Sequence, residues 1–449
     1  MILCFCYNRK SYLLLSRFLN TVDAIKELSV MSVYYPIDRY KEEYVVPGCY
    51  DKIGANAFEY CDTLRRVAVS EGVTEIQSSA FYGCKGLVEV SLPKSLRIIR
   101  SHAFGRCFSL RKINIPPGVC VEGAAFSGCE SLAPIALSEK VKLSHLPEKV
   151  RFGGSSYSIG YAFNKCALRS PVIVPNNVTL GEGAFGGAKF RSIVLPENLK
   201  TIEKGMFGDC SLLENVVVPE GVEEIKEEAF VGCTALKSIV FPESLRKIKA
   251  DAFRNCLSLQ SIVIPKRVYR IEKEAFLNCS SLKSVDIPGY IDLDYHGNFQ
   301  GCSLLTSVVM PKCLRIPREC FQDCSSLTSI EIPRVRWINS RAFAGCTALT
   351  SIMLPESLRK IKAEAFRNCL SLQYIVIPKK VGEIGSVAFG GCSSLTSVFI
   401  PDSVSKIGYD AFEGCKSLTI YAPKGSFAAQ YARKNNIKWS ENVNVNEEN

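Results

Sequence analysis

The 449-residue chain contains little of what most enzymes use. Its three histidines are His102, His145 and His296, and none lies in a nucleophile, zinc-binding or phosphate-loop motif. No stacking-aromatic motif accompanies the basic residues, as single-strand nucleic-acid binders usually require. The sequence therefore predicts no enzymatic activity, no cofactor, no metal site and no nucleic-acid partner.

Long apolar runs are also missing. The opening MILCFCYNRKSYLLLSRFL places its basic residues after the first apolar run and has frequent polar breaks, so it predicts no signal peptide. No segment approaches the roughly 20 apolar residues of a membrane-spanning helix. Taken alone, these features favour a soluble and intracellular chain.

What the chain has in abundance is repetition. The stretch PESLRKIKADAFRNCLSL at Pro242 returns at Pro355 with one change, Asp251 to Glu364. A phenylalanine, followed in all but one case by cysteine three positions later, marks each unit, and neighbouring units are 22 or 23 residues apart. One step of 37 residues, from Phe126 to Phe163, breaks the rhythm. The sixteen phenylalanines are Phe58, Phe81, Phe104, Phe126, Phe163, Phe185, Phe207, Phe230, Phe253, Phe276, Phe299, Phe321, Phe343, Phe366, Phe389 and Phe412.

Each unit follows the pattern A-F-x-x-C-x-x-L-x-x-[IV]-x-[IL]-P-x-x-[VL]-x-x-I, as in AFRNCLSLQSIVIPKRVYRI. The alternation before the proline predicts a short strand with Ile262 and Ile264 on one face and Val263 on the other. Proline ends the strand because it has no N–H for the ladder. The Ala-Phe pair is expected to open a tight helical turn. A unit this small cannot bury its apolar side chains alone, so the units must stack into a solenoid.

The segment SLTSVFIPDSVSKIGYDAFEGCKSL, Ser394 to Leu418, resembles the BspA-like subclass of leucine-rich repeat proteins. The resemblance implies an α/β solenoid of about sixteen coils, built mostly from short strands with tight helical turns. It also implies a non-enzymatic protein on the cell surface or secreted, which binds partner or host proteins or mediates adhesion. A misplaced start codon or a non-classical export route would reconcile that location with the missing signal peptide.

Three regions follow from the pattern. Residues 1–42 form an N-terminal cap with a short helix in NTVDAIKELSV, and residues 43–423 form the repeat solenoid. Residues 424–449 form a C-terminal cap, in which Ser426 begins the helix FAAQYARKN ahead of an acidic tail. An irregular insertion near residues 139–157 is either a binding loop or a degenerate unit, and the second interpretation is favoured.

The 21 cysteines suggest metal or disulfide chemistry, yet fifteen occupy the slot three residues after the phenylalanine. A column of parallel thiols cannot converge on one ion. Their stacking distance of roughly 4.8 Å also exceeds what a disulfide prefers between Cβ atoms. The slot therefore predicts small buried apolar side chains.

Solenoids bind through the outward face of their strands, so the position two residues before each proline is the first candidate surface. This column becomes apolar partway along the chain, which suggests a binding surface. The alternative is purely structural, because the shape of valine suits any exposed strand. The candidate binding residues are Val194, Val217, Val240, Val263, Val309, Met353, Val376, Phe399 and Tyr421.

The net charge of +11 supplies a second candidate surface. Basic residues gather after the proline in neighbouring units and could form a strip that binds a polyanionic glycan. With 44 acidic residues interspersed, a simply solvated surface is the favoured alternative. The strip comprises Arg246, Lys247, Lys249, Arg254, Lys266, Arg267 and Arg270.

The stretch IDLDYHGNF offers Asp292, Asp294 and His296 in an irregular unit. A metal site there is conceivable, but a degenerate coil with solvated polar residues is the better interpretation. The leading functional hypothesis is a protein-binding or adhesive solenoid. The alternatives are an intracellular interaction scaffold that uses the same surface, and polyanion binding through the basic strip.

Overall fold

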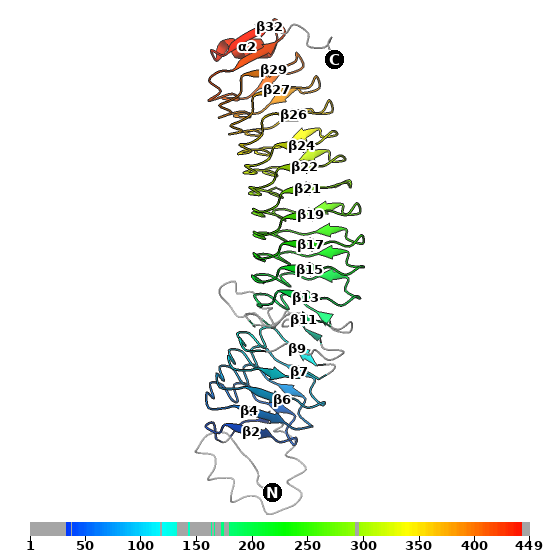
Figure 1. Cartoon of the computed structure of the whole chain (residues 1–449), viewed down its shortest axis with the longest axis vertical. Helices are drawn as coiled ribbons and strands as arrows, with labels where there is room; N and C mark the ends of the chain where they lie inside the picture. Colours follow the sequence, from blue (N-terminus) through cyan, green and yellow to red (C-terminus); the bar gives the residue numbers. More distant parts are fainter. Residues whose placement is uncertain are drawn as a thin grey trace, which may run out of the picture. The chain divides into compact units, whose positions relative to one another are not determined.

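The computed structural model describes residues 33–36, 38–116, 119–132, 142–143, 163, 166, 172–174, 179–291 and 296–441. The chain divides into two compact units, Met1–Pro196 and Glu197–Asn449. In each unit, coils of the backbone stack with all neighbouring strands parallel (Figure 1). The predicted solenoid of about sixteen turns is confirmed.

One coil of the second unit shows why the repeat folds in this way. Ile262 and Ile264 are 3% and 0% exposed, whereas Val263 between them is 68% exposed, as the alternation predicts. After Pro265 the chain turns, and Val268 and Ile271 are again buried. The coil therefore encloses its apolar side chains from two sides.

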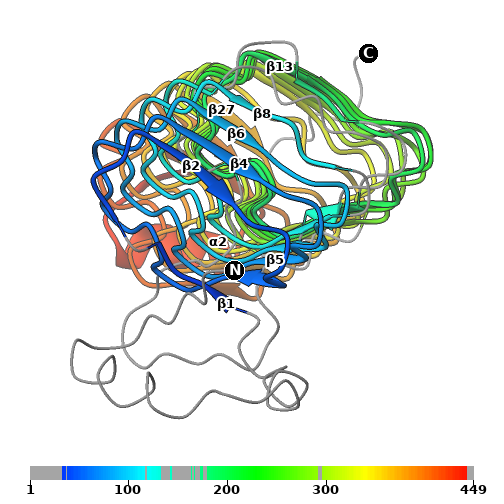
Figure 2. The same ribbon diagram turned by 90° about the horizontal axis from the view of Figure 1, so that it is seen from below.

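Each regular coil also contains a second strand, usually of two residues, which the sequence pattern does not reveal. In the first unit, the first strands and the second strands lie on different sides of the coil (Figure 2). Neighbouring strands of each set pair in parallel because successive coils repeat the same path. The solenoid thus offers two strand faces to its surroundings.

The first unit contains two groups of first strands and one continuous ladder of second strands. The first strands are β2 (Glu43–Val46), β4 (Arg66–Val69), β6 (Glu89–Ser91) and β8 (Lys112–Ile113), then the pair β11 (Val172–Ile173) and β13 (Ser192–Val194). The second strands are β1 (Val33–Tyr34), β3 (Lys52–Ile53), β5 (Glu75–Ile76), β7 (Ile98–Ile99), β9 (Cys120–Val121), β10 (Lys142–Leu143) and β12 (Thr179–Leu180).

The second unit has the same organisation. Its first strands are β15 (Asn215–Val217), β17 (Ser238–Val240), β19 (Ser261–Val263), β21 (Ser284–Asp286), β22 (Ser307–Val309) and β24 (Ser329–Glu331), followed by β27 (Tyr374–Val376), β29 (Ser397–Phe399), β31 (Thr419–Ala422) and β32 (Lys438–Glu441). Its second strands are β14 (Thr201–Ile202), β16 (Glu224–Ile225), β18 (Lys247–Ile248) and β20 (Arg270–Ile271), followed by β23 (Arg315–Ile316), β25 (Trp337–Ile338), β26 (Lys360–Ile361), β28 (Glu383–Ile384) and β30 (Lys406–Ile407).

The Ala-Phe segment forms a hydrogen-bonded turn in the described coils. The helical turn that the sequence predicted there is absent, so the label α/β describes this fold only loosely. Asp251 and Asn255 flank Phe253 with φ of +57° and +59°, which a right-handed helix does not allow. The Phe253 N–H donates to the Ala275 carbonyl of the next coil at 2.7 Å. Alternate backbone donors of the turn therefore join coils, and the donors between them close the turn itself.

The ends and the insertion add detail to this scheme. α2 (Phe427–Lys434) begins after Ser426, whose hydroxyl accepts a hydrogen bond from the Ala429 N–H, as predicted. The N-terminal helix expected in residues 20–30 lies outside the described residues. Within the insertion, β10 pairs in parallel with both β9 and β12, so it occupies the place of a coil's second strand.

Stacked phenylalanine rings form the centre of each unit. From Phe58 to Phe185 in the first unit, neighbouring ring centroids lie 4.8–5.8 Å apart. From Phe207 to Phe412 in the second unit, they lie 5.0–5.7 Å apart. The ring stack therefore forms the core against which the strands pack.

Candidate binding surfaces

The first strands of the second unit carry the surface that the sequence predicts for binding. Val217, Val240 and Val263 are 69%, 64% and 68% exposed, while the residue before each is buried. Val217 lies opposite Val240 in the parallel register of β15 and β17. Because paired strands lie about 4.8 Å apart, the three side chains form one row, which we call the valine patch.

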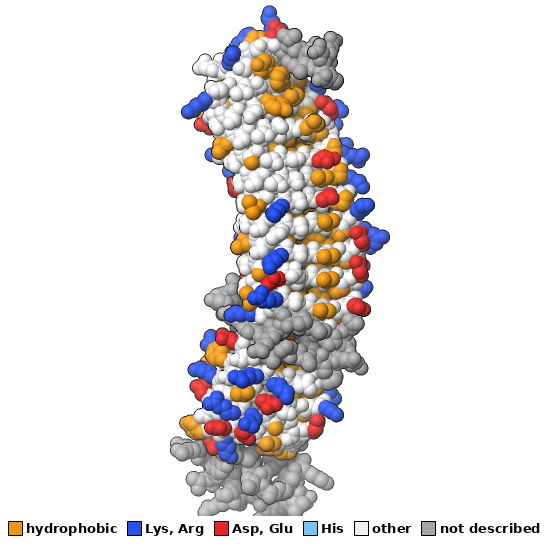
Figure 3. Space-filling model, viewed as in Figure 1, with side chains coloured by type: hydrophobic (Ala, Val, Ile, Leu, Met, Phe, Trp, Pro, Cys, Tyr) orange, Lys and Arg blue, Asp and Glu red, His pale blue; other side chains and the backbone are white. Residues whose placement is uncertain are grey.

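The remaining candidates do not continue this row without interruption. Asp286 and Glu331 occupy the same column on β21 and β24, on either side of the half-buried Val309. Figure 3 shows hydrophobic side chains recurring along one face of the second unit, with charged side chains at the edge of that face. Val194, which is 54% exposed, belongs to the first unit.

A second group of apolar side chains lies nearer the C-terminus of the second unit. Met353 is 89% exposed and Val376 is 54% exposed. Phe399 and Tyr421 are half-buried and stack with ring centroids 4.7 Å apart. We call these four residues the terminal patch.

Most side chains of the predicted basic strip form ion pairs with carboxylates of the same or a neighbouring coil. Lys249 lies 3.2 Å from Glu272, and Arg254 lies 3.2 Å from both Asp251 and Glu274. These contacts neutralise the local charge, which lowers the attraction for a polyanion. Arg246 likewise pairs with Glu223 at 3.7 Å, and Arg270 pairs with Glu272 at 3.4 Å.

The other three residues of the strip differ in surroundings. The Lys247 ammonium lies 5.8 Å from the centroid of the Tyr269 ring, a cation–π distance. Lys266 and Arg267 are exposed on the turn after Pro265. The structure therefore places the strip on adjacent coils, but largely as paired charges.

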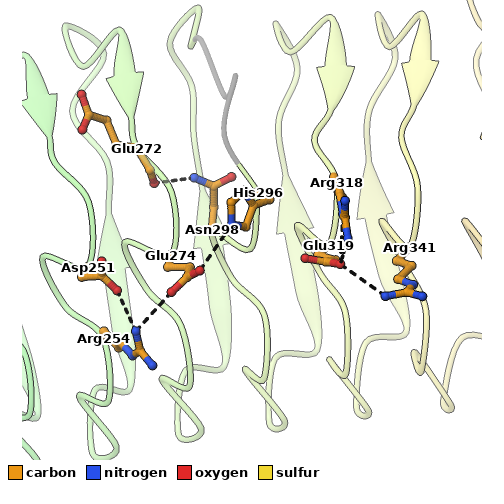
Figure 4. Close-up of polar contacts among 9 residues, drawn as sticks. All are labelled: Asp251, Arg254, Glu272, Glu274, His296, Asn298, Arg318, Glu319 and Arg341. Atoms are coloured by element: carbon orange, nitrogen blue, oxygen red, sulfur yellow. Dashed lines mark hydrogen bonds and ion pairs between the residues drawn. The ribbon is translucent and has the colours of Figure 1, made fainter.

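The irregular coil around His296 is stabilised by polar contacts (Figure 4). His296 Nε2 lies 3.4 Å from Glu274 Oε1. The fully buried Asn298 donates from Nδ2 to the Glu272 carbonyl at 2.7 Å. Asp292 and Asp294 lie outside the described residues, and no group of three or more metal-ligating side chains occurs among the residues that are described.

The sequence profile of the BspA type leucine rich repeat region matches residues 51–149, 157–283, 206–327 and 314–436. The chain belongs to the BspA-type leucine-rich repeat family. Among curated proteins, no sequence matches it significantly.

Several solved structures resemble this BspA-type protein. A leucine-rich repeat protein from Bacteroides ovatus is 24% identical, with a TM-score of 0.63 over 91% of this chain and 94% of that chain. A leucine rich cell surface protein from Faecalibacterium prausnitzii is 23% identical, with a TM-score of 0.35 over 88% of this chain and 90% of that one. The Bacteroides structure supports the fold.

The described residues include no helix that is long and apolar enough to cross a membrane.

The cysteine column of this BspA-type solenoid lies in the core. Of the 19 described cysteines, all are free thiols, and those of the repeated slot are buried except the half-buried Cys415. The Cys256 Sγ–H donates to the Phe230 carbonyl of the preceding coil at 3.2 Å, a contact that recurs along both units. Burial raises the pKa of Cys302 to about 12, so the thiol stays protonated and unreactive.

A hollow that the repeat pattern did not predict lies on the second-strand face of the second unit. It has a volume of about 340 Å³ and is lined by Arg315, Trp337, Asn339, Lys360 and Lys362. Trp337 lies opposite Arg315 and Lys360 in the parallel register. The repeat spacing carries the signal, because Trp337 and Lys360 are one unit apart, as are Asn339 and Lys362.

Proposed function

We propose that this BspA-type chain is a non-enzymatic protein-binding protein that recognises a partner through the valine patch. The observation that supports this function most directly is the exposure of Val217, Val240 and Val263, each 64–69%, in one row on a rigid parallel sheet. Exposed apolar rows of this kind are typical of protein interaction sites.

The surroundings of the patch favour a protein partner. Ser238 and Ser261 lie opposite each other beside the valines and are exposed. The Ser238 hydroxyl donates to Asn215 Oδ1 at 3.1 Å. An apolar row beside hydroxyl and amide groups matches the apolar centre and polar rim of protein interfaces.

The proposed setting is the cell surface or the secreted fraction, where the partner is an adhesion target or a host protein. An intracellular scaffold would use the same patch, so location distinguishes the two. Mass spectrometry of surface-shaved, secreted and cytoplasmic fractions of the native cell tests this point. Recovery from the cytoplasmic fraction alone would favour the scaffold.

The binding test uses the full chain and the double variant Val217→Asp, Val263→Asp. Proteins captured from an extracellular fraction by the unaltered chain are identified, and their affinities for each variant are measured. We expect at least a tenfold loss of affinity, roughly the effect of removing an interface hot spot.

The matched control is Ala68→Asp, Ser91→Asp, because both residues occupy the equivalent exposed slot in the first unit. Circular dichroism and thermal melts establish that both double variants fold. Equal binding by the two variants would exclude the valine patch as the contact surface.

The polyanion alternative has its own test. It would be favoured if the chain is retained on heparin at low salt and the double variant Lys266→Glu, Arg267→Glu is not.

A further inference from the structure

The hollow on β23, β25 and β26 has the composition of a ligand site. Among its lining residues, Trp337 is half-buried, and Arg315, Lys360 and Lys362 are exposed. No carboxylate belongs to its lining. Its volume of about 340 Å³ lies at the lower end of the range for small-molecule sites, about 300–1,000 Å³.

Three of the lining side chains keep their polar groups available. In the described part of the chain, no hydrogen bond or ion pair involves the Trp337 indole N–H, the Asn339 carboxamide or the Lys362 ammonium. The carboxamide can donate and accept, and the ammonium offers three donors. A ligand that satisfies them must carry both neutral hydroxyl or amide groups and a negative charge.

We propose that this hollow binds an acidic saccharide, with the apolar face of one sugar ring on Trp337 and its carboxylate at Lys362. Asn339 and Lys362 occupy the same position on adjacent coils, two residues beyond Trp337 and Lys360. A ring on the indole therefore has an amide and an ammonium along the same edge. The assignment is independent of the proposed protein-binding function, which uses the first-strand face.

Charge on this face is suited to a ligand with separated negative charges. Lys360 lies 3.1 Å from Glu383, and Lys406 lies 2.9 Å from the same carboxylate. Glu383 therefore already compensates one lysine and repels a densely charged polyanion. Lys362, two residues beyond Lys360, keeps its full charge for the ligand.

A second hollow in the same unit shows what the first one lacks. It has a volume of about 400 Å³, and its lining contains two carboxylates, Glu223 and Glu224, in addition to basic residues. Arg246 pairs with Glu223 at 3.7 Å, so the cation there is already partnered. Its aromatic ring, Tyr269, lies against Lys247. This hollow supplies matched control variants.

A single-stranded nucleic acid fits the first hollow less well. Such ligands stack successive bases on several aromatic side chains. The positions equivalent to Trp337 on the two adjacent coils are Arg315 and Lys360, so only one ring is available. One stacking surface with hydrogen-bonding groups at its edge suits a sugar ring.

The experiment uses the chain's two tryptophans, Trp337 and Trp439. In the full-length Trp439→Phe variant, Trp337 is the only indole and its fluorescence reports on the hollow directly. A hyaluronan tetrasaccharide, which carries uronic acid carboxylates, is titrated against this variant. Chitotetraose supplies the neutral control of equal length. We expect saturable quenching by the hyaluronan fragment and about tenfold weaker binding of chitotetraose.

Substitutions then locate the site. Lys362→Ala is expected to weaken binding of the acidic fragment about tenfold, whereas Lys362→Arg largely retains it. Trp337→Ala, followed by calorimetry, removes the stacking face and abolishes measurable binding. Lys200→Ala in the second hollow, at an exposed lysine outside the basic strip, leaves the affinity unchanged.

Several results would overturn the proposal. Equal affinity for the acidic and neutral fragments would exclude recognition of charge. An affinity that is insensitive to Lys362→Ala would exclude this hollow as the site. An absence of quenching at millimolar hyaluronan fragment, or tighter binding of a short oligothymidylate, would show that the ligand is not an acidic saccharide.

Discussion

Inside each unit, the repeat phenylalanines pack between the phenylalanines of the neighbouring coils. Phe253 lies 5.1 Å from both Phe230 and Phe276, with ring planes within 6°, and Phe241 approaches it edge-on at 5.6 Å. The contacts are dispersion and burial, with no polar group at the ring. A single ring therefore stabilises two interfaces between coils.

Phe253→Ala tests this contribution. The substitution leaves a cavity that the two adjacent rings cannot fill, so we expect a loss of about 3–5 kcal/mol in the free energy of unfolding. Denaturant unfolding of the full chain measures the loss. Tyr374→Ala is the control, because Tyr374 is 52% exposed and its removal should change stability by less than about 0.5 kcal/mol. Similar losses in both variants would contradict the role of the ring stack.

The buried thiols give a pH dependence whose sign follows from their raised pKa values. Burial raises the pKa of Cys302 to about 12, against about 8.5 in an unfolded chain. Above about pH 8.5 the unfolded chain releases this proton and the folded chain retains it. Stability must therefore fall as the pH rises towards 12.

Cys302→Ala measures this effect at one site. The variant lacks the thiol that is penalised at high pH, so the stability cost of the substitution should be about 2 kcal/mol smaller at pH 10 than at pH 7. Unfolding is followed at both pH values with reductant present. A cost that does not change with pH would mean that the thiol ionises without penalty in the folded coil.

Neighbouring coils are joined by ladders of charge whose strength depends on burial. In the first unit, Arg100 lies 2.8 Å from Glu75 and 2.8 Å from Glu122, whose side chain is only 3% exposed. In the second unit, Arg341 lies 3.0 Å from Glu364 and 3.6 Å from Glu319, with more solvent around the pair. The ion pairs of Arg100 should therefore contribute more to the free energy of unfolding than those of Arg341.

Arg100→Met and Arg341→Met compare the two ladders. Removing Arg100 leaves a buried carboxylate without its cation, and we expect a loss of about 3 kcal/mol at pH 7. Removing Arg341 should cost less than about 1 kcal/mol. Equal losses in denaturant unfolding would show that burial does not control these pairs.

The Arg341 ladder also sets the pKa of Glu364. The hydrogen bond from Arg341 lowers this pKa, although partial burial opposes the shift. Because the folded pKa is lowered, the stabilisation is present above about pH 4.3, the unfolded value, and is lost as the pH falls further. In Arg341→Met the pKa of Glu364 should rise, as carboxyl NMR titration can measure.

The repeat pattern determined how much of these elements could be predicted from the sequence. Ile262, Ile264, Val268 and Ile271 recur at fixed positions, so the buried face of the coil was predictable. The two-residue second strands were not, because two residues show no periodicity. The prediction of a helical turn was wrong: Asp251 has a positive φ, and its N–H donates to the Lys273 carbonyl of the next coil, which the pattern of one unit does not reveal.

The surfaces were predictable only in part. The exposed positions of Val217 and Val263 follow from strand alternation. Arg254 pairs with Asp251 of its own coil and with Glu274 of the next coil, and partner choice there depends on side-chain reach. The register of Trp337 against Lys360 follows from the repeat spacing, but the sequence does not show that these side chains border a hollow.

At the scale of a whole unit, stability is distributed from coil to coil. Each coil contacts its two neighbours, so a unit is stabilised by the sum of these interfaces and its ends are the weakest points. In the second unit, α2 and β32 cover the last coil. Ala428, Ala429 and Ala432 are buried, and β32 pairs in parallel with β31 along four residues. Tyr431 meets Phe412, the last ring of the stack, edge-on at 6.1 Å.

Ending the chain at Pro423 tests this cap. Without α2 and β32, the edge of β31 and the Phe412 ring become accessible to water, so we expect amides of β30 and β31 to exchange hydrogen faster. Amides of β19 and β20, several coils away, should keep their protection and serve as an internal control.

Ala432→Asp in the full chain places a charge at a fully buried position and should loosen the same coils without truncation. Faster exchange throughout the second unit would mean that it unfolds as one cooperative block. Unchanged exchange in β30 and β31 would show that α2 and β32 do not protect the end of the solenoid.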